Sequence, residues 1–351
     1  MGFNQYAGAL LASAAGLGMS LGVTASYAAD MPLKAPPTVV EPLDMHAFFD
    51  LSFKNAYITP RGLLVTNTGL TTQILAGISA DVYKSKTGFI NSVSVYSYVW
   101  NDLWSKQNDP KVGSWNEFDW AVGMTVKFAQ NWKFGVEYVE FLSPPGNFSI
   151  ERNIEFTLAY DDSSWWGGGP FTLNPYVKLF YAVSSGSSTV VVGKAGDTYD
   201  VEIGIVPTYD FKKSSGVALT VSAPTWITVG PSEYWNKNVF IAGSSADIMT
   251  RFFAGASNFC GSDSNEACKT NGVGVFSTGL TAKLALAPYV PLRLGGWYIK
   301  GGFQYYHIIN DALQAAQIFT SAASKQSNVY GTFPQTHQNV TVGFIGTGMS
   351  F

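Results

Sequence analysis

Residues 117–128 read Glu-Phe-Asp-Trp-Ala-Val-Gly-Met-Thr-Val-Lys-Phe, and apolar side chains alternate there with polar, charged or small ones without a break. A β-strand has a two-residue period, so this segment places its aromatic and aliphatic side chains on one face and its carboxylates, lysine and glycine on the other. Such a pair of faces is typical of a strand with lipid on one side and water on the other. The segment therefore predicts a membrane-spanning β-strand.

The composition points to the same class of protein. The 351 residues are 46% hydrophobic and 15% aromatic but only 13% charged, whereas a typical soluble domain is about 25% charged. After the N-terminal region no run of 18 apolar residues follows, so no membrane-spanning helix is expected. Since lipid cannot hydrogen-bond an open sheet edge, a closed barrel is the remaining membrane fold. The net charge of −3 gives no reason to expect nucleic-acid binding.

The alternating pattern recurs along the chain and predicts an all-β fold, a transmembrane antiparallel up-and-down barrel of about 12 strands. The expected strands are 48–59, 71–83, 88–101, 116–128, 132–142, 151–161, 171–183, 199–211, 217–229, 273–286, 296–309 and 339–351. Short connections alternate with long ones at 60–70, 102–115, 143–150, 184–198, 230–272 and 310–338. Outer-membrane barrels have short periplasmic turns and longer external loops in this way. The alternative, a soluble exported β-sandwich, leaves the aromatic outer faces unexplained.

The N-terminal region divides into two expected segments before the barrel. Residues 1–28 read as a secretory signal peptide with an apolar core and a cleavage site at Ser26-Tyr27-Ala28. A membrane anchor is the alternative, against which the polar residues after the core argue. Residues 29–47 are proline-rich and predict an extended periplasmic lead-in to a barrel at 48–351. In an exported chain, Cys260 and Cys268 are expected to form a disulfide within one loop.

The tryptophans fall into two groups along the predicted strands. Trp132, Trp165, Trp166 and Trp297 lie by short turns, and Trp100, Trp104, Trp115, Trp120 and Trp226 lie toward long loops. An indole ring is amphipathic and favours the interface between membrane and water. The two groups therefore predict two membrane interfaces.

Three segments carry a resemblance to bacterial outer-membrane β-barrels. Ala29-Asp30-Met31-Pro32-Leu33-Lys34-Ala35-Pro36-Pro37 is similar to the mature start of many alphaproteobacterial porins and small surface proteins. Gly348-Met349-Ser350-Phe351 resembles the C-terminal signal that the barrel-assembly machinery reads, with Phe351 as its last residue. Asn55-Ala56-Tyr57-Ile58-Thr59-Pro60-Arg61-Gly62 resembles a segment of the uncharacterised Gcw_chp exported barrel family. The resemblance implies a porin-like protein of the bacterial outer membrane, with membrane lipid and the assembly machinery as partners.

Charged side chains with the inward parity are the candidate functional residues, since a charge facing lipid is costly. We expect the following residues to line the pore: Asp50, Lys54, Asp81, Glu117, Asp119, Lys127, Glu137, Glu155, Lys178, Asp200, Glu202, Lys283 and Lys300. Asp161, Asp210 and Lys133 share this parity. Carboxylates exceed lysines among these residues, and inward glycines such as Gly123, Gly135, Gly204, Gly279 and Gly302 are expected to leave room for water. Opposite charges that pair across a plugged interior are the alternative.

The sequence offers little for catalysis. No phosphate-binding loop or metal-ligand cluster is present, so no cofactor, metal or enzymatic activity is expected. His307 shares the lipid-facing parity, and no serine partner can be assigned to it, which argues against the lipid-face Ser/His site of an outer-membrane phospholipase. We expect a passive narrow channel for small ions or polar solutes with a modest preference for cations. The alternative is a closed structural or surface-interaction barrel whose long external loops bind partners.

Overall fold

A computed structural model describes residues 44–67, 69–105, 114–144, 150–183, 198–231, 234, 272–290, 295–310 and 338–351. Contacts divide the chain into a unit at 1–42, which lies outside these residues, and the unit Leu43–Phe351, which is described here. The signal peptide, most of the lead-in and the Cys260–Cys268 disulfide therefore lie outside the described residues and stay predictions. In the described ranges, no helix combines the length and the apolar character needed to cross a bilayer.

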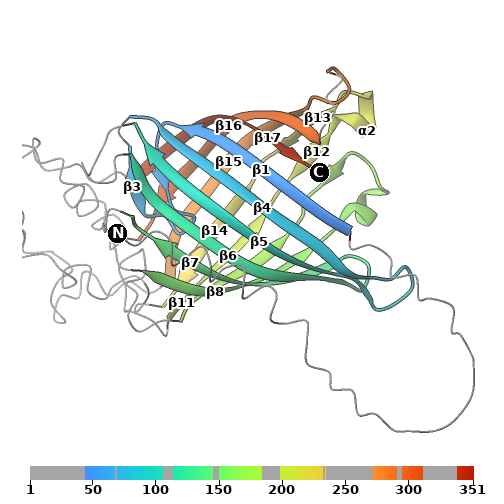
Figure 1. Ribbon diagram of the computed structural model, residues 1–351, viewed down its shortest axis with the longest axis horizontal. Helices are drawn as coiled ribbons and strands as arrows, with labels where there is room; N and C mark the ends of the chain where they lie inside the picture. Colours follow the sequence, from blue (N-terminus) through green and yellow to red (C-terminus); the bar gives the residue numbers. More distant parts are fainter. Residues whose placement is uncertain are drawn as a thin grey trace, which may run out of the picture. The chain divides into compact units, whose positions relative to one another are not determined.

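The unit Leu43–Phe351 is a closed antiparallel barrel of 12 up-and-down strands (Figure 1). In their order around the wall, the strands are β1 (Asp44–Lys54), β4 (Thr71–Lys84), β5 (Ile90–Trp104), β6 (Trp115–Phe128), β7 (Trp132–Leu142), β8 (Glu151–Tyr160), β10 (Tyr176–Ala182), β11 (Thr198–Ile205), β14 (Thr225–Gly230), β15 (Gly272–Ala285), β16 (Gly296–Ile308) and β17 (Asn339–Ser350). The predicted fold class is confirmed, and most strand borders agree with the structure within about two residues.

The last strand closes the barrel against the first. β17 pairs antiparallel with β1 over seven residues, from Phe48 opposite Ser350 to Lys54 opposite Phe344. Beyond this ladder, the Ala47 amide donates to the Phe351 carbonyl at 2.7 Å and the Phe351 amide donates to the Ala47 carbonyl at 3.0 Å. Closure leaves no open sheet edge, which is the condition for a sheet surrounded by lipid.

Prolines interrupt three neighbouring strands at one level of the wall. β9 (Phe171–Thr172), β12 (Thr208–Asp210) and β13 (Leu219–Ser222) continue β10, β11 and β14 beyond Pro175, Pro207 and Pro224. Proline has no amide hydrogen and breaks a ladder. The proline carbonyls still accept bonds from the adjacent strand, at 3.0 Å for Pro175, 2.8 Å for Pro207 and 3.1 Å for Pro224. The wall therefore stays joined across the interruptions.

The two faces of β6 agree with the alternation in its sequence. Val122 and Met124 point outward and are 45% and 37% exposed, whereas Ala121 is fully buried inside. Glu117 and Asp119 are also buried on the inner face. The barrel therefore presents an apolar outer surface and a polar interior on this strand, as predicted.

The first strand and the loop after it differ from the prediction. β1 spans Asp44–Lys54 instead of 48–59, and residues 55–66 form a small hairpin of β2 (Tyr57–Ile58) and β3 (Leu64–Thr66). At its tip the Thr59 amide donates to the Leu63 carbonyl at 2.8 Å, and Gly62 takes the left-handed φ of 94° that favours glycine. A chain that turns inward here leaves the wall early, so the strand ends sooner than its alternation suggested.

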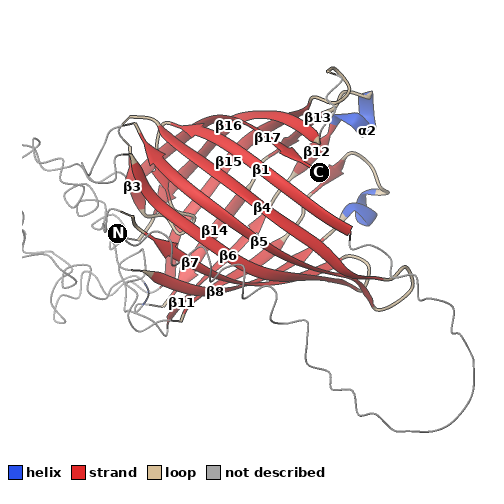
Figure 2. Cartoon of the chain, viewed as in Figure 1, coloured by secondary structure: helices blue, strands red, loops and turns tan. Residues whose placement is uncertain are grey.

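Two short helices lie in the turns at one end of the barrel, while strands make up most of the described chain (Figure 2). They are η1 (Ser163–Trp166) and α2 (Phe211–Ser215). Asp161 accepts a bond from the Ser163 amide at 2.9 Å, and Asp210 caps α2 by accepting from the Lys212 amide at 2.9 Å. These two carboxylates therefore organise turns and do not face the interior along a strand.

Candidate functional site

The hairpin at 55–66 lies inside the barrel. Its Tyr57 ring packs on Trp100 of β5, with ring centroids 5.5 Å apart. Its Arg61 donates from Nη1 to Glu151 of β8 at 3.1 Å. Since these partners belong to inner faces of separate strands, the hairpin occupies part of the lumen. The prediction of an external loop at 60–70 is wrong for this part of the segment, because its apolar side chains are buried against the inner wall.

Arg61 is held by aromatic faces as well as by a carboxylate. Its guanidinium lies 5.2 Å from the ring centroid of Phe141 on β7 and 5.3 Å from that of Phe180 on β10. Both distances are within the range of cation–π attraction. The side chain is 3% exposed, so this one cation is fixed inside the barrel by three strands.

Carboxylates surround this single arginine. Glu151 is its direct partner, and five further carboxylates lie on the inner faces of the same part of the wall: Glu117, Asp119, Glu155, Asp200 and Glu202. All six are buried. Both carboxylate oxygens of Asp200 and Oδ1 of Asp119 lack a hydrogen-bond partner among the described residues. Because a buried carboxylate is costly without compensating charge or hydrogen bonds, this cluster is a candidate site for cations, water or protons.

Lysines neutralise only part of the remaining inner charge. Lys178 Nζ lies 2.5 Å from Glu155 and 3.8 Å from Glu137. On the opposite arc of the wall, Lys300 Nζ lies 2.7 Å from Asp50. Lys178 therefore pairs with one member of the carboxylate cluster, Glu155, and Lys300 forms a separate ion pair with Asp50.

Tyrosines cross glycines to reach carboxylates two strands away. Tyr96 of β5 stands opposite Gly123 of β6, which stands opposite Glu137 of β7, and the Tyr96 hydroxyl donates to Glu137 at 3.0 Å. Tyr298 donates to Asp50 at 2.6 Å across Gly348 in the same arrangement on β16, β17 and β1. Both rings lie where a glycine Cβ would be. The space left by these inward glycines is therefore filled by rings instead of water.

Most of the other inward glycines also leave no room for water, because neighbouring atoms fill the space beside them. A Cβ on Gly204 would meet the Tyr176 ring, one on Gly279 would meet Gln304, and one on Gly302 would meet backbone. Gly135 differs, because the nearest atom to its Cβ position is 3.8 Å away.

The structure brings most predicted pore residues to the inner face. The charged residues that share it are Asp50, Lys54, Glu117, Asp119, Glu137, Glu155, Lys178, Asp200, Glu202, Lys283 and Lys300. Lys283 lies 3.8 Å from the Tyr298 ring centroid. Lys127 is opposite Lys133 near a short turn, away from the acidic cluster.

Asp81 lies apart from the acidic cluster, with Asp44 and His46. The three side chains have ligand atoms within 4.8 Å of one another, which would suit a metal ion. Lys84 Nζ, however, lies 2.5 Å from Asp44 and 2.9 Å from Asp81. A lysine ammonium thus already pairs with both carboxylates, and this group is an ion-pair network at the end of the strands.

Sequence reasoning missed three members of the site. Asp102 belongs to β5, not to a loop, and accepts from the Thr71 hydroxyl at 2.5 Å and from the Trp104 indole. Glu151 starts β8 on the parity of Glu155, so extending that parity would have found it. Asp102 likewise continues the inward parity of Trp100. No local signal marks Arg61, whose position depends on the inward path of the hairpin.

The two-interface assignment of the tryptophans is wrong for three of them. Trp100 and Trp104 face inward on β5, and Trp226 packs edge-on against Tyr306 inside the barrel, with ring centroids 5.9 Å apart. Trp165 and Trp166 are exposed by a short turn, as expected. His307 lies on the outer face, and its Nδ1 is 2.8 Å from Asn339 Oδ1.

No family model and no curated protein matches the sequence. Solved structures with some likeness are barrels. The translocator domain of the autotransporter NalP from Neisseria meningitidis is 11% identical, with 88% of each chain covered and a TM-score of 0.33. A porin is 12% identical, with 88% of this chain and all of that one covered and a TM-score of 0.28. OprB from Pseudomonas putida is 9% identical, with coverages of 88% and 94% and a TM-score of 0.36. These scores assign the chain to none of those families, so its alphaproteobacterial and Gcw_chp resemblances stay predictions.

Proposed function

We propose that this protein is a passive, narrow channel of the bacterial outer membrane that passes small ions or polar solutes and prefers cations. The observation that carries the proposal is the surplus of buried carboxylates on the inner wall, where Arg61 and Lys178 are the paired cations among six carboxylates, Glu117, Asp119, Glu151, Glu155, Asp200 and Glu202. Fixed negative charge with low-dielectric walls raises the local concentration of cations. The closed barrel with an apolar outer face supports the location in a membrane.

A second function is favoured by the inward hairpin. Ala56, Ile58 and Leu64 are buried inside the barrel, so part of the lumen is filled with side chains. A barrel of this kind would be closed and would act as a structural or surface-interaction protein through its long external loops. Conduction is the property that separates the two functions, because only the channel needs a continuous path of water.

The test is single-channel recording of the purified protein in a planar bilayer. We expect discrete open steps and, across a KCl gradient, a reversal potential on the cation side. Replacing Glu117 and Glu202 with Gln and Asp200 with Asn should move that potential toward zero. The shift should be smaller in 1 M than in 0.1 M salt, because the screening length falls from about 10 Å to about 3 Å.

Glu140→Gln is the matched control, since Glu140 lies on the outer face of β7 and pairs with Arg152 at 2.7 Å. It should leave the reversal potential unchanged. A silent bilayer would favour the closed barrel, and anion selectivity would contradict the proposed role of the carboxylates.

A further inference from the structure

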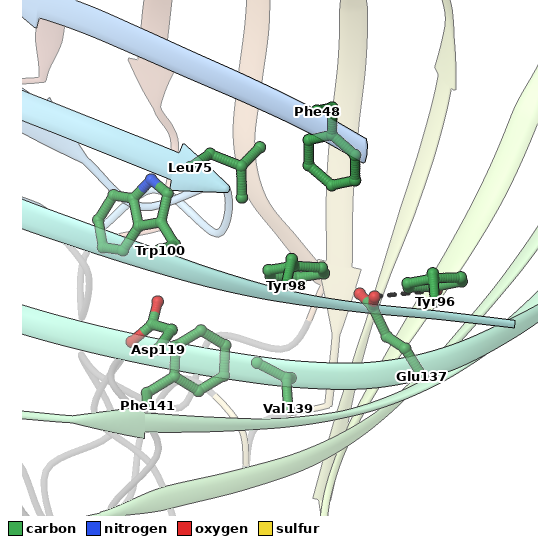
Figure 3. A pocket seen from close by; sticks show the side chains of 9 residues that line it. All are labelled: Phe48, Leu75, Tyr96, Tyr98, Trp100, Asp119, Glu137, Val139 and Phe141. Atoms are coloured by element: carbon green, nitrogen blue, oxygen red, sulfur yellow. Dashed lines mark hydrogen bonds between the residues drawn. The ribbon is translucent and has the colours of Figure 1, made fainter. Parts of the chain in front are cut away.

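A cavity of about 500 Å³ opens on the inner wall between β1 and β7 (Figure 3). Its walls are mainly aromatic and come from Phe48, Tyr96, Tyr98, Trp100 and Phe141. The rings of Tyr96 and Tyr98 are nearly parallel, with an interplanar angle of 5°. Several π faces that converge on one cavity suit a ligand with positive charge spread over an apolar body.

Two carboxylates, Asp119 and Glu137, complete the cavity, and one oxygen of Asp119 has no hydrogen-bond partner in the described part of the chain. Asp119 is 6% exposed, lines the cavity, and its Oδ1 has no hydrogen-bond partner among the described residues. The arginine that interacts with it, Arg61, makes its direct ion pair with Glu151. Since a buried carboxylate is costly without compensation, Asp119 marks a place for a cationic group.

The other carboxylate, Glu137, is only partly compensated. It accepts from the Tyr96 hydroxyl at 3.0 Å (Figure 3), while the ammonium of Lys178 lies 3.8 Å away and is closer to Glu155, at 2.5 Å. The cavity therefore keeps an excess of negative charge beside its aromatic walls.

Two cationic side chains of the protein itself already pack on aromatic rings beside carboxylates. The Arg61 guanidinium lies over Phe141, a wall of the cavity, and over Phe180. Lys178 lies 4.6 Å from the Phe180 ring centroid. The same wall thus pairs aromatic faces with carboxylates around a positive charge, and neither Arg61 nor Lys178 is among the residues that line the cavity itself.

We propose that this cavity binds an organic ammonium ion, quaternary or alkylated, with its charge toward Asp119 and Glu137 and its apolar groups against the rings. A small metal cation holds its water tightly and gains little from such walls, whereas an alkylated ammonium is weakly hydrated and gains from both. This inference rests on the proposed function in one respect: the organic ammonium ion would reach the cavity as a solute of the channel. Binding itself can be measured without conduction.

The experiment titrates the purified full chain in detergent with choline by isothermal calorimetry. 3,3-Dimethyl-1-butanol, a neutral molecule of the same shape, is the ligand control. We expect saturable choline binding and at least about tenfold weaker binding of the alcohol, from loss of the cation–π and ionic attraction. Equal binding of the two, or no saturable binding of choline, would overturn the proposal.

Asp119→Asn should weaken choline binding by about fivefold to tenfold, since it removes the unpartnered charge. Asp200→Asn is the matched control, because Asp200 is also buried and its carboxylate oxygens have no hydrogen-bond partner among the described residues, but it does not line the cavity. It should change the affinity by less than about twofold. An equal loss in both variants would mean that general lumen charge, not this cavity, attracts choline, and the proposal would be wrong.

Glu137→Gln keeps an acceptor for Tyr96 and serves as the test if Asp119→Asn does not fold, as judged by heat-modifiable migration. It should weaken choline binding by a similar factor, and unchanged binding in a folded Glu137→Gln protein would count against the site. The bilayer recordings distinguish the two proposals. A silent protein that binds choline supports the cavity and contradicts the channel, whereas a conducting protein that does not bind choline does the reverse.

Discussion

At the scale of the residue, glycines on the inner wall decide where aromatic rings lie. An added Cβ at Gly123 would stand 2.4 Å from the Tyr96 ring, and one at Gly348 would stand 2.3 Å from the Tyr298 hydroxyl. Without side chains at these positions, each tyrosine lies flat across the neighbouring strand and reaches a carboxylate beyond it. The glycines therefore orient Glu137 and Asp50 through the tyrosines.

Gly123→Ala should displace Tyr96 and destabilise the barrel by about 1–3 kcal/mol, the usual cost of overpacking. Gly135→Ala is the control on the adjacent strand, where a Cβ would meet its nearest atom at 3.8 Å. It should be neutral or slightly stabilising, because alanine has less freedom than glycine in the unfolded chain. Urea unfolding in lipid vesicles measures both. Equal stabilities for the two variants would show that Tyr96 moves without cost.

At the scale of the element, each strand separates an apolar face from a polar one. β6 carries Val122 outward and Thr125 inward, about 10 Å apart along the strand. The β2–β3 hairpin departs from this rule, because it leaves the wall and buries both of its faces inside the barrel.

Val122→Arg places a charge on the outer face of β6 and should destabilise the folded protein by about 2–4 kcal/mol near the middle of the bilayer. Thr125→Arg places the same charge in the polar interior and should cost much less. Folding of both variants into vesicles, followed by urea titration, gives the comparison. If both arginines are tolerated equally, the outer face of β6 does not contact lipid.

At the scale of the whole molecule, stability depends on one seam between the two ends of the barrel chain. β1 and β17 are neighbours in space but nearly 300 residues apart in sequence, and the two bonds between Ala47 and Phe351 extend their ladder. Closing so long a loop costs chain entropy before any bond is gained. Phe351 therefore contributes, through its two backbone bonds with Ala47, to the pairing that closes the barrel.

Deletion of Phe351 should lower the amount of folded, heat-modifiable protein in membranes. The deletion removes the backbone pair with Ala47 and the terminal aromatic residue that resembles an assembly signal. Phe351→Tyr keeps both features and is the control, with folded amounts expected near those of the original chain. Undiminished folding of the deletion variant would contradict the assembly role of this residue.

The sequence by itself determined the wall of this protein, and the tertiary structure decided what lies within it. The alternation at 117–128 reports a local property, the two-residue period of a strand, so strand number, faces and most borders could be predicted. The positions of Trp100, Trp104, Trp226 and Arg61 could not. Trp100 contacts the hairpin and Arg61 belongs to it, and the hairpin buries apolar residues against parts of the wall far away in sequence. Trp104 and Trp226 are held by contacts with Asp102 and Tyr306, and no periodic pattern records such pairings. Asp102 stood one step beyond the predicted end of its strand, whereas Glu151 was the first residue of a predicted strand and shares the inward parity of Glu155.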